Sequence, residues 1–253
     1  MKRATIAVLA AVLILVTGVS AFARGSQEEN DGVTKLIIAS DCTWPPMEFV
    51  NTDKEMVGYD IDFINAVAKE GGFEVEIRNT AWDGIFASLG NGESDAVISS
   101  VTITEDRKKT MDFSLPYINA GQVLIVSVDS SAKTLADLDG KEVGAQIGTT
   151  GAIEISNSGA TLKTYDELGF AIEDLANGRI EGVVADTPIA ADYVLQNDNY
   201  KSTLMIVGDS FTDEYYGIAV KKDNSEVLDL INKGIKAVQE KGIDKELEDK
   251  WLR

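Results

Sequence analysis

Residues 60–79 read DIDFINAVAKEGGFEVEIRN, and the change of hydrophobic spacing within this stretch decides the fold class. Its first part has apolar residues three and four positions apart, which places them on one helix face: Ile61, Ile64, Val67 and Ala68. We expect Asp60 to cap the start of this helix and Gly71 to end it. After the glycines, residues 73–79 alternate between apolar and polar, so a strand follows the helix.

The same alternation of strand and helix continues along the chain. Further strands are predicted over residues 35–40, 95–99, 122–128, 142–147, 179–186, 202–208 and 215–222. Further helices are predicted over residues 82–92, 148–156, 166–178, 187–196, 225–241 and 244–251. This order predicts an α/β fold with helix-covered, mostly parallel sheets. The pattern restarts near residue 121, after PYINAG, so two small sheets fit the chain better than one.

The first residues have the composition of a secretory signal peptide. Lys2 and Arg3 precede an apolar stretch over residues 6–16, and the small-residue pattern AFA follows at 21–23. The apolar stretch is short for a membrane span, although an uncleaved anchor is the alternative. We expect cleavage after Ala23, so that residues 1–23 form the signal peptide and the polar residues 24–33 a flexible lead-in.

The composition excludes several classes of function. The formal net charge is −19 at pH 7, and loss of the leader's two basic residues makes it −21, so no basic surface is available for nucleic acid. Histidine is absent, which excludes Ser-His and Cys-His catalysis. The single cysteine, Cys42, rules out an internal disulfide. A zinc site would need carboxylates alone, which is rare, so we expect no metal and no cofactor.

Polar and aromatic side chains gather where the predicted strands end. In parallel α/β sheets, ligands bind at the carboxyl ends of strands, beside the N-termini of helices. The candidate ligand-binding residues at these ends are Asp41, Trp44, Trp82, Ser99, Ser100, Thr102, Arg107, Gln146, Thr149, Thr150 and Asp186. Their common position predicts a single site.

The chemistry of these side chains fits a free α-amino acid. Arg107 offers a planar fork that matches a carboxylate with two hydrogen bonds. Four hydroxyls suit the same anion: Ser100, Thr102, Thr149 and Thr150. Asp186 would meet an ammonium, and Asp41 would add negative charge beyond the backbone part of the ligand. The indoles of Trp44 and Trp82 offer flat apolar faces that also attract cations.

Each residue also has a simpler structural explanation. Arg107 lies in TEDRKK, a charged run that could be a solvated surface. Asp186 precedes Thr-Pro, where an acid commonly caps a helix. Trp44 and Trp82 could be core residues, and GTTG at 148–151 lacks the lysine of a phosphate-binding loop. The shared location at strand ends favours the functional interpretation.

At these residues the sequence resembles a known family, the periplasmic polar-amino-acid-binding proteins of ABC importers, family 3 of the solute-binding proteins. The resemblance covers nearly all of the mature chain. It rests on DCTWPPMEF (41–49), VGYDID (57–62), AWDGIFASL (81–89), DAVISSVTITEDR (95–107), FSLPY (113–117), QIGTTG (146–151) and DT (186–187).

The resemblance implies the type II periplasmic binding protein fold, with two lobes, two hinge strands and the amino acid in the cleft. Residues 34–118 and 216–253 would form lobe 1, and residues 119–215 lobe 2. Arg107 corresponds to the arginine that grips the α-carboxylate, and Asp186 to the aspartate that takes the α-ammonium. Contacts to the ligand backbone are implied for Ser100 and Thr102 in lobe 1 and for Thr149 and Thr150 in lobe 2.

The resemblance also bears on the ligand. Trp44 and Trp82 fall where aromatic or apolar residues sandwich the ligand side chain, and Asp41, Ser99 and Gln146 occupy positions that vary with the ligand. The combination of DCTWPPMEFV, AWDGIF and NAGQV is most similar to members that take basic amino acids, namely arginine, lysine or histidine. Glutamine is the next candidate, because Gln146 could serve its amide.

An enzymatic function is the alternative from a different class, because some proteins that resemble this fold are cyclohexadienyl dehydratases. Such a reaction needs a general acid or base, for which Glu48 and Glu154 are the candidates, although Glu48 could point into lobe 1 instead. We expect no enzymatic activity. The expected partners are a free L-amino acid and the permease subunits of an ABC importer, with membrane contact through the permease alone. We expect a periplasmic monomer.

Overall fold

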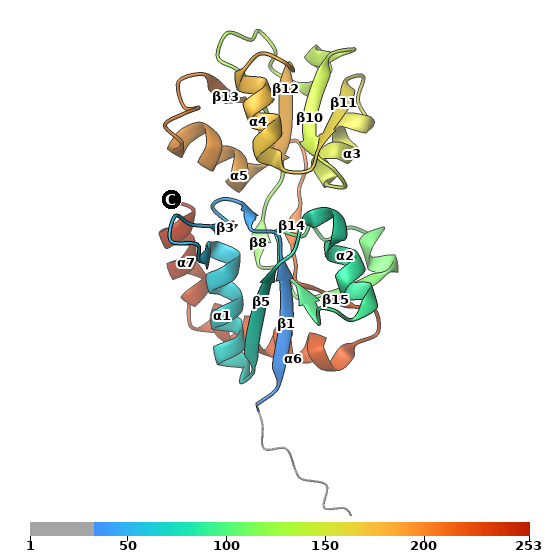
Figure 1. Cartoon of the computed structure of the whole chain (residues 1–253), viewed down its shortest axis with the longest axis vertical. Helices are drawn as coiled ribbons and strands as arrows, with labels where there is room; N and C mark the ends of the chain where they lie inside the picture. The colour runs from blue at the N-terminus through green and yellow to red at the C-terminus, as the bar shows by residue number, and fades with distance from the viewer. Residues whose placement is uncertain (1–32) are drawn as a thin grey trace, which may run out of the picture. The chain divides into compact units, whose positions relative to one another are not determined.

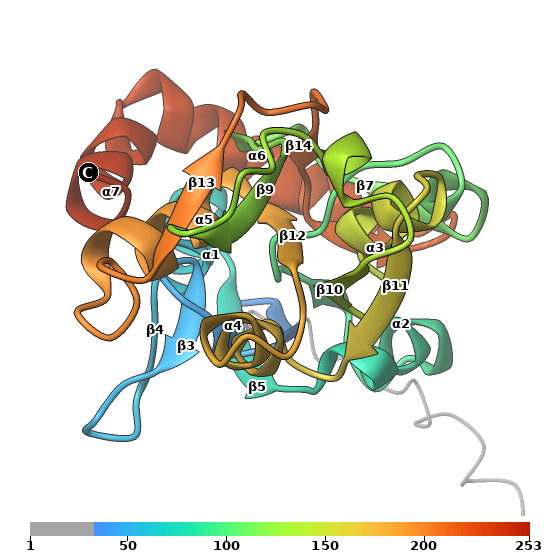
Figure 2. The ribbon, with the colours of Figure 1, turned by 90° about the horizontal axis from the view of Figure 1, so that it is seen from above.

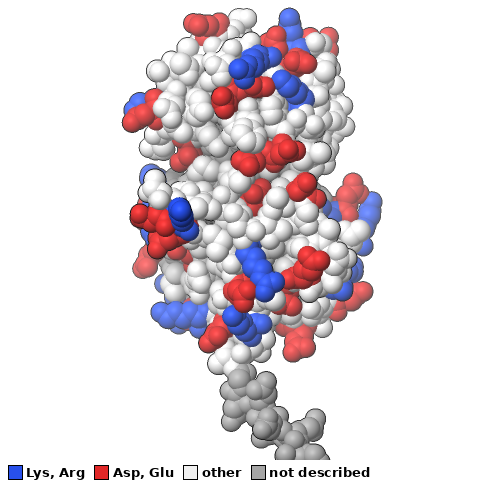
Figure 3. All heavy atoms as spheres, viewed as in Figure 1, with Lys and Arg blue, Asp and Glu red and all other residues white. Residues whose placement is uncertain are grey.

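The computed structural model describes residues 33–253. The predicted signal peptide and nearly all of the predicted lead-in therefore lie outside the described residues. Within 33–253, every helix is too short or too polar to cross a membrane. On the face shown in Figure 3, acidic side chains are scattered among basic and uncharged ones and form no single patch.

The first five-stranded sheet has the order β5-β1-β6-β15-β7. Its strands are β1 (Lys35–Ser40), β5 (Glu74–Asn79), β6 (Ala96–Val97), β7 (Met111–Phe113) and β15 (Ala219–Lys221). Strands β5 and β6 pair parallel with β1, whereas β15 runs antiparallel to both β6 and β7. Four of the five strands therefore run in one direction, which confirms the prediction of a mostly parallel sheet.

Helices cover both faces of this sheet because its strands are apolar on both sides. Ile38 faces a core that includes Phe63 of α1 (Tyr59–Gly71) and Ile235 of α6 (Ser225–Glu240). The next residue, Ala39, faces a separate core with Ile85 of α2 (Trp82–Asn91). Successive strand residues point to opposite faces, so α1 and α6 lie on one side and α2 on the other (Figure 1). Helix α7 (Ile243–Trp251) packs on α1 and α6.

The second five-stranded sheet has the order β11-β10-β12-β9-β13. Its strands are β9 (Gln122–Ser127), β10 (Glu142–Gln146), β11 (Thr161–Tyr165), β12 (Gly182–Asp186) and β13 (Leu204–Val207). Only β9 runs against the others. Alternate residues of β9 again face two cores, and helices α3 (Thr150–Ser156) and α4 (Leu168–Ala176) cover the opposite faces (Figure 2).

Two short strands, β8 (Ile118–Asn119) and β14 (Tyr215–Tyr216), pair antiparallel where the chain passes between the sheets. Strand β8 leads into β9 of the second sheet, and β14 leads back to β15 of the first. The protein therefore has two lobes joined by two crossings; we call the part built on the first sheet lobe 1 and the part built on the second sheet lobe 2. The boundaries at residues 118/119 and 215/216 stay a prediction.

The smaller elements complete the two lobes. Lobe 1 also has a three-stranded sheet of β2 (Thr43–Trp44), β3 (Glu48–Val50) and β4 (Met56–Val57), and a 3-10 helix over Arg107–Lys109. Lobe 2 has a 3-10 helix over Leu135–Leu138 and helix α5 (Thr187–Ala191), which continues as a π-helical turn over Asp192–Gln196.

Two local predictions were wrong. Helix α1 begins at Tyr59 after Gly58, and Asp60 makes no cap; its buried carboxylate accepts hydrogen bonds from the Ser100 amide (2.8 Å) and the Tyr117 hydroxyl (2.9 Å). The helix ends through Gly72, whose φ of 82° is left-handed, one residue after the predicted glycine. Asp60 does not cap the helix because tertiary hydrogen bonds occupy its carboxylate. Gly71 was predicted as the end of the helix because it is the first of two adjacent glycines, but the second has the left-handed backbone.

Candidate functional site

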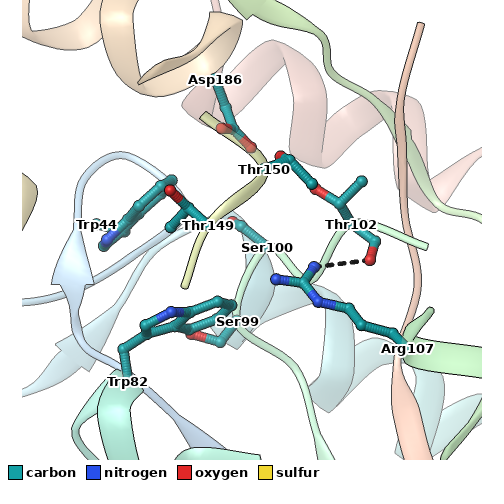
Figure 4. Close-up of a pocket in the computed structure, with 9 residues that line it drawn as sticks. All are labelled: Trp44, Trp82, Ser99, Ser100, Thr102, Arg107, Thr149, Thr150 and Asp186. Carbon is teal, nitrogen blue, oxygen red and sulfur yellow. Dashed lines mark hydrogen bonds between the residues drawn. The ribbon is translucent and has the colours of Figure 1, made fainter. Parts of the chain in front are cut away.

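A pocket lies between the two lobes (Figure 4). Lobe 1 lines it with Trp44, Trp82, Ser99, Ser100, Thr102 and Arg107, and lobe 2 with Thr149, Thr150 and Asp186. These are nine of the eleven residues predicted from strand ends. The other two, Asp41 and Gln146, are buried behind the lining. The strand ends of both sheets therefore meet at one pocket.

Arg107 turns inward from a charged surface run. Its neighbours Lys108 and Lys109 pair with the exposed acids Glu105 and Asp106, as expected of a solvated surface. The Arg107 guanidinium instead donates from Nη1 to the Thr102 carbonyl at 2.8 Å. It lies 5.5 Å from the ring centroid of Trp82, which holds it by a cation–π contact.

The same guanidinium reaches lobe 2. Its Nη2 donates to the carbonyl of Gly148 at 3.2 Å. Burial lowers the pKa of Arg107, and the carboxylates of Asp186 and Glu214 act in the opposite direction. The fork is therefore a fixed positive charge at the pocket wall, held by carbonyl groups.

Asp186 ends strand β12 and is fully enclosed at the lobe 2 side of the pocket. It precedes α5, but its side chain makes no capping hydrogen bond, so the simpler explanation does not hold. Its carboxylate accepts from Gln122 Nε2 and from the Tyr216 hydroxyl, both at 2.5 Å. Burial raises the pKa of Asp186 to about 6, against the effect of these hydrogen bonds and of Arg107. A buried carboxylate of this kind gains from a nearby cation.

The two tryptophans line the pocket, one packed against another aromatic ring and one hydrogen-bonded to the other lobe. Trp82 packs edge-on against Phe86, with ring centroids 5.1 Å apart. The indole Nε1 of Trp44 donates to Oε1 of Gln146, which belongs to the other lobe. Gln146 Nε2 donates to Asp41 at 3.2 Å and to the Asp166 carbonyl at 2.8 Å. Trp44, Gln146 and Asp41 therefore form one polar chain across the lobes behind the indole wall.

Ser99 and Ser100 form the floor of the pocket above two buried acids. Their hydroxyls donate to the two carboxylate oxygens of Glu48, at 3.0 and 3.2 Å. Glu48 thus points into lobe 1 and does not line the pocket. Ser100 has a φ of 50°, which is unusual for a residue with a side chain. The bonds from its hydroxyl to Glu48 and from its amide to Asp60 hold this conformation.

Burial raises the pKa of both acids, that of Glu48 well above its ordinary value and that of Asp60 to about 6. The nearby Asp60 adds to the rise at Glu48, whereas hydrogen bonds, first among them that from the Ser100 amide, act against the rise at Asp60. Two carboxyl groups packed together without a cation favour one shared proton. The floor of the pocket is therefore built on a pair that carries less charge than two free carboxylates.

The threonines differ in what their hydroxyls are free to do. Thr149 caps α3: its hydroxyl accepts from the Ala152 amide at 3.3 Å and donates to the Gln146 carbonyl at 2.8 Å. The hydroxyls of Thr102 and Thr150 lie within reach of Glu214, at 3.1 and 2.7 Å. Sequence reasoning missed Glu214 because it ends no core strand; the only signal is its position directly before the returning strand β14.

The two glutamates considered as general acid or base do not meet at the pocket. Neither Glu48 nor Glu154 lines the pocket. Burial raises the pKa of Cys42 to about 11, so its thiol stays protonated at neutral pH. Within residues 33–253, no group of three or more histidine, cysteine, aspartate or glutamate side chains is arranged to hold a metal ion.

Comparison with known proteins gives a consistent result. A probable histidine-binding protein of Neisseria gonorrhoeae is 35% identical over 81% of this chain and 78% of its own length. The L-cystine-binding protein of Escherichia coli K12 is 32% identical over 99% of this chain and 95% of its own. Among solved structures, an ancestral arginine-binding protein bound to arginine has a TM-score of 0.81 and 40% identity, covering 87% of this chain and 98% of its own.

The relatives align over most of their length, and the family described as bacterial extracellular solute-binding proteins, family 3, matches residues 36–253. The match includes both lobes and every residue that lines the pocket. The chain belongs to the bacterial extracellular solute-binding proteins, family 3.

Proposed function

We propose that the protein binds one free basic amino acid, arginine, lysine or histidine, in the pocket between its lobes and delivers it to an ABC importer. The observation that carries this proposal is that Arg107 of lobe 1 and Asp186 of lobe 2 line the same pocket. A zwitterion between them would place its carboxylate on the guanidinium and its ammonium on the buried acid.

The walls of the pocket support a cationic side chain. The indoles of Trp44 and Trp82 line it, and aromatic faces attract ammonium and guanidinium groups. Asp41 lies behind Trp44 and supplies negative charge on that side; burial raises its pKa. Two of the proteins compared above are named for histidine and for arginine, which supports a basic ligand.

Binding would favour the closed arrangement of the lobes. Trp44–Gln146 and Arg107–Gly148 contacts already connect lobe 1 with lobe 2. An amino acid that touches both lobes makes its full set of contacts only when they are closed, so it stabilises that state over an open one. The closed form would then be recognised by the permease subunits of the importer.

The family is extracellular, which supports secretion of the chain through the predicted signal peptide and action of the protein in the periplasm. We propose that it acts there as a monomer. Its contact with the membrane would be through the permease alone.

A different polar ligand is the second candidate, because one relative is named for L-cystine and Gln146 lies near the pocket. The hydrogen bonds of Gln146 weigh against a glutamine ligand. Its amide donates to Asp41 and Asp166 and its carbonyl accepts from Trp44, so a ligand amide would have to displace one of them. A dehydratase has less support, since both acids considered for catalysis lie outside the pocket lining.

Thermal unfolding of the purified protein with each standard amino acid tests this function. A ligand that binds only the folded state adds about 4 kcal/mol to the free energy of unfolding at about a thousandfold excess over its Kd. The largest rise in Tm is expected with arginine or lysine. A rise with glutamate alone would contradict the basic preference, and no rise with any amino acid would contradict amino-acid binding.

A further inference from the structure

Glu214 lies where the two lobes and the hinge meet. It is half-buried and directly precedes strand β14. One of its carboxylate oxygens, Oε2, accepts hydrogen bonds from three donors. Thr102 of lobe 1 donates to it at 3.1 Å, Thr150 of lobe 2 at 2.7 Å, and Gln122 at 3.4 Å. Glu214 thus contacts the pocket lining of both lobes without lining the pocket itself.

The direction of these hydrogen bonds follows from Gln122. Its amide nitrogen lies 2.5 Å from the Asp186 carboxylate and 3.4 Å from that of Glu214, so the NH₂ end must face these acceptors. The same nitrogen lies 3.1 Å from the Thr150 hydroxyl oxygen, which therefore accepts from it. The single proton of the Thr150 hydroxyl then has two possible acceptors, Glu214 at 2.7 Å and the Thr102 hydroxyl at 3.5 Å, and it points to the carboxylate, which is the closer and the stronger acceptor.

The direction of the Thr102 hydroxyl proton follows from its possible acceptors as well. This hydroxyl has two neighbours, Glu214 at 3.1 Å and the Thr150 hydroxyl at 3.5 Å. A carboxylate is the stronger acceptor and also the closer one, so the Thr102 proton points to Glu214. Both hydroxyl protons are therefore taken by Glu214, which leaves the oxygens of these two pocket-lining threonines to act as acceptors.

A hydroxyl that can only accept repels a carboxylate and suits an ammonium. This differs from the sequence-based expectation that Thr102 and Thr150 hydroxyls serve the carboxylate of the ligand. It also groups the pocket by charge: Asp186 and Glu214, joined through Gln122, form an acidic end. Arg107 would bind the other charged group of the ligand, the carboxylate. The charges of Asp186 and Glu214 favour the protonated form of Arg107.

We propose that Glu214 is a positioning residue for the α-ammonium: it takes the hydroxyl protons of Thr102 and Thr150, and so turns one hydroxyl from each lobe into an acceptor beside Asp186. This inference rests on the proposed function, because it assigns a further residue to the same site. Glu214 acts through the threonines and needs no contact with the ligand.

Glu214→Gln tests this role with two probes, L-arginine and its analogue in which a hydroxyl replaces the α-amino group. If the amino-acid screen selects another ligand, that amino acid and its 2-hydroxy analogue replace them. The variant removes the charge that fixes the threonine protons, so arginine affinity is expected to fall about tenfold or more. The neutral analogue depends less on acceptors, so its affinity is expected to change little.

Asp213→Asn is the matched control. Asp213 is the exposed neighbour of Glu214, and its carboxylate contacts Asn119 away from the pocket, so both probes should keep their wild-type affinity. Thr150→Val provides a second variant if Glu214→Gln does not fold, and it should show the same selective loss of arginine.

The two measurements separate the two proposals. Equal losses for arginine and its 2-hydroxy analogue, or no loss for either, in a folded wild-type-like variant would overturn the role of Glu214 while leaving amino-acid binding intact. Failure of the wild-type protein to bind any amino acid would overturn the proposed function and this inference with it.

Discussion

The guanidinium of Arg107 in lobe 1 donates a hydrogen bond of 3.2 Å to the carbonyl of Gly148 in lobe 2. The same group donates to Thr102 within its own lobe at 2.8 Å. One planar side chain is thus fixed between the lobes at the wall of the pocket. Its position makes it the residue on which recognition of any amino acid should depend.

Arg107→Ala is expected to abolish measurable binding of every amino acid, because no other cation lines the pocket within the described residues. Arg107→Lys keeps a positive charge but loses the planar fork, so it should recover only part of the affinity. Calorimetry with arginine and with glutamine measures both effects.

Lys108→Ala is the control for that experiment, because Lys108 is next in sequence but exposed and paired with Glu105. It should bind as the wild type does. Unchanged affinity in Arg107→Ala would refute the assignment of this side chain.

Asp41→Asn is expected to alter which ligand side chain is preferred and to leave recognition of the ligand's α-carboxylate and α-ammonium intact. Asp41 does not line the pocket and is joined to the Trp44 indole by hydrogen bonds through Gln146. Loss of its charge should lower arginine affinity about tenfold relative to glutamine affinity. Asp53→Asn, at an exposed turn, is the control. Equal losses for both amino acids would place Asp41 outside side-chain selection.

Affinity should fall in acid because of Asp186. Burial raises its pKa to about 6 in the free protein, and a bound ammonium favours the charged carboxylate, so the pKa in the complex is lower. Binding then releases a proton below about pH 6, and affinity drops by up to about tenfold per pH unit there while staying constant above it. Titrations in buffers of different ionisation enthalpy measure the released proton.

Asp60 has a pKa of about 6 as well, so the source of this pH dependence needs a control. The 2-hydroxy analogue of the ligand supplies it, because a neutral hydroxyl stabilises the Asp186 carboxylate less than an ammonium does. A pH slope of the same size with both ligands would assign the effect to the floor of lobe 1 and contradict the role of Asp186.

Glu48→Gln should make the protein more stable than wild type in alkali. The pKa of Glu48 is raised in the folded state, so the wild type loses stability as the pH rises from the ordinary glutamate pKa through the folded value. Glutamine stays neutral and keeps hydrogen-bonding groups for Ser99 and Ser100. Thermal unfolding at about pH 6 and about pH 9 measures the difference.

Glu48→Ala is the matched comparison. It leaves the two serine hydroxyls and Asp60 without their partner and should lower the free energy of unfolding by about 3 kcal/mol at both pH values. A glutamine variant as unstable as the alanine variant would show that the floor requires a charged Glu48.

Much of the fold was predictable because the period of the hydrophobic pattern changes at each element boundary. Strand β1 and helix α2 have the predicted start, and four strands of each sheet share a direction as expected. The prediction of one strand over 215–222 was wrong, because this segment forms two short strands in different sheets, β14 and β15. A single apolar run cannot reveal that the chain changes sheets within it.

The candidate site was predictable to the extent that parallel strands end at the same edge of a sheet. This rule brought Arg107, Asp186 and the two tryptophans to one pocket. The rule does not apply to residues beside the strands that connect the lobes, so Glu214 was missed. Nor does it fix where a hydroxyl proton goes, because that depends on Gln122 and on acids far away in sequence.

The crystal structure of the protein with bound arginine tests the central claim most directly. The ligand carboxylate should lie against the Arg107 fork and the α-ammonium within hydrogen-bonding distance of Asp186, with the guanidinium between Trp44 and Trp82. An arginine bound outside this pocket, or one whose carboxylate and ammonium contact other groups, would contradict it.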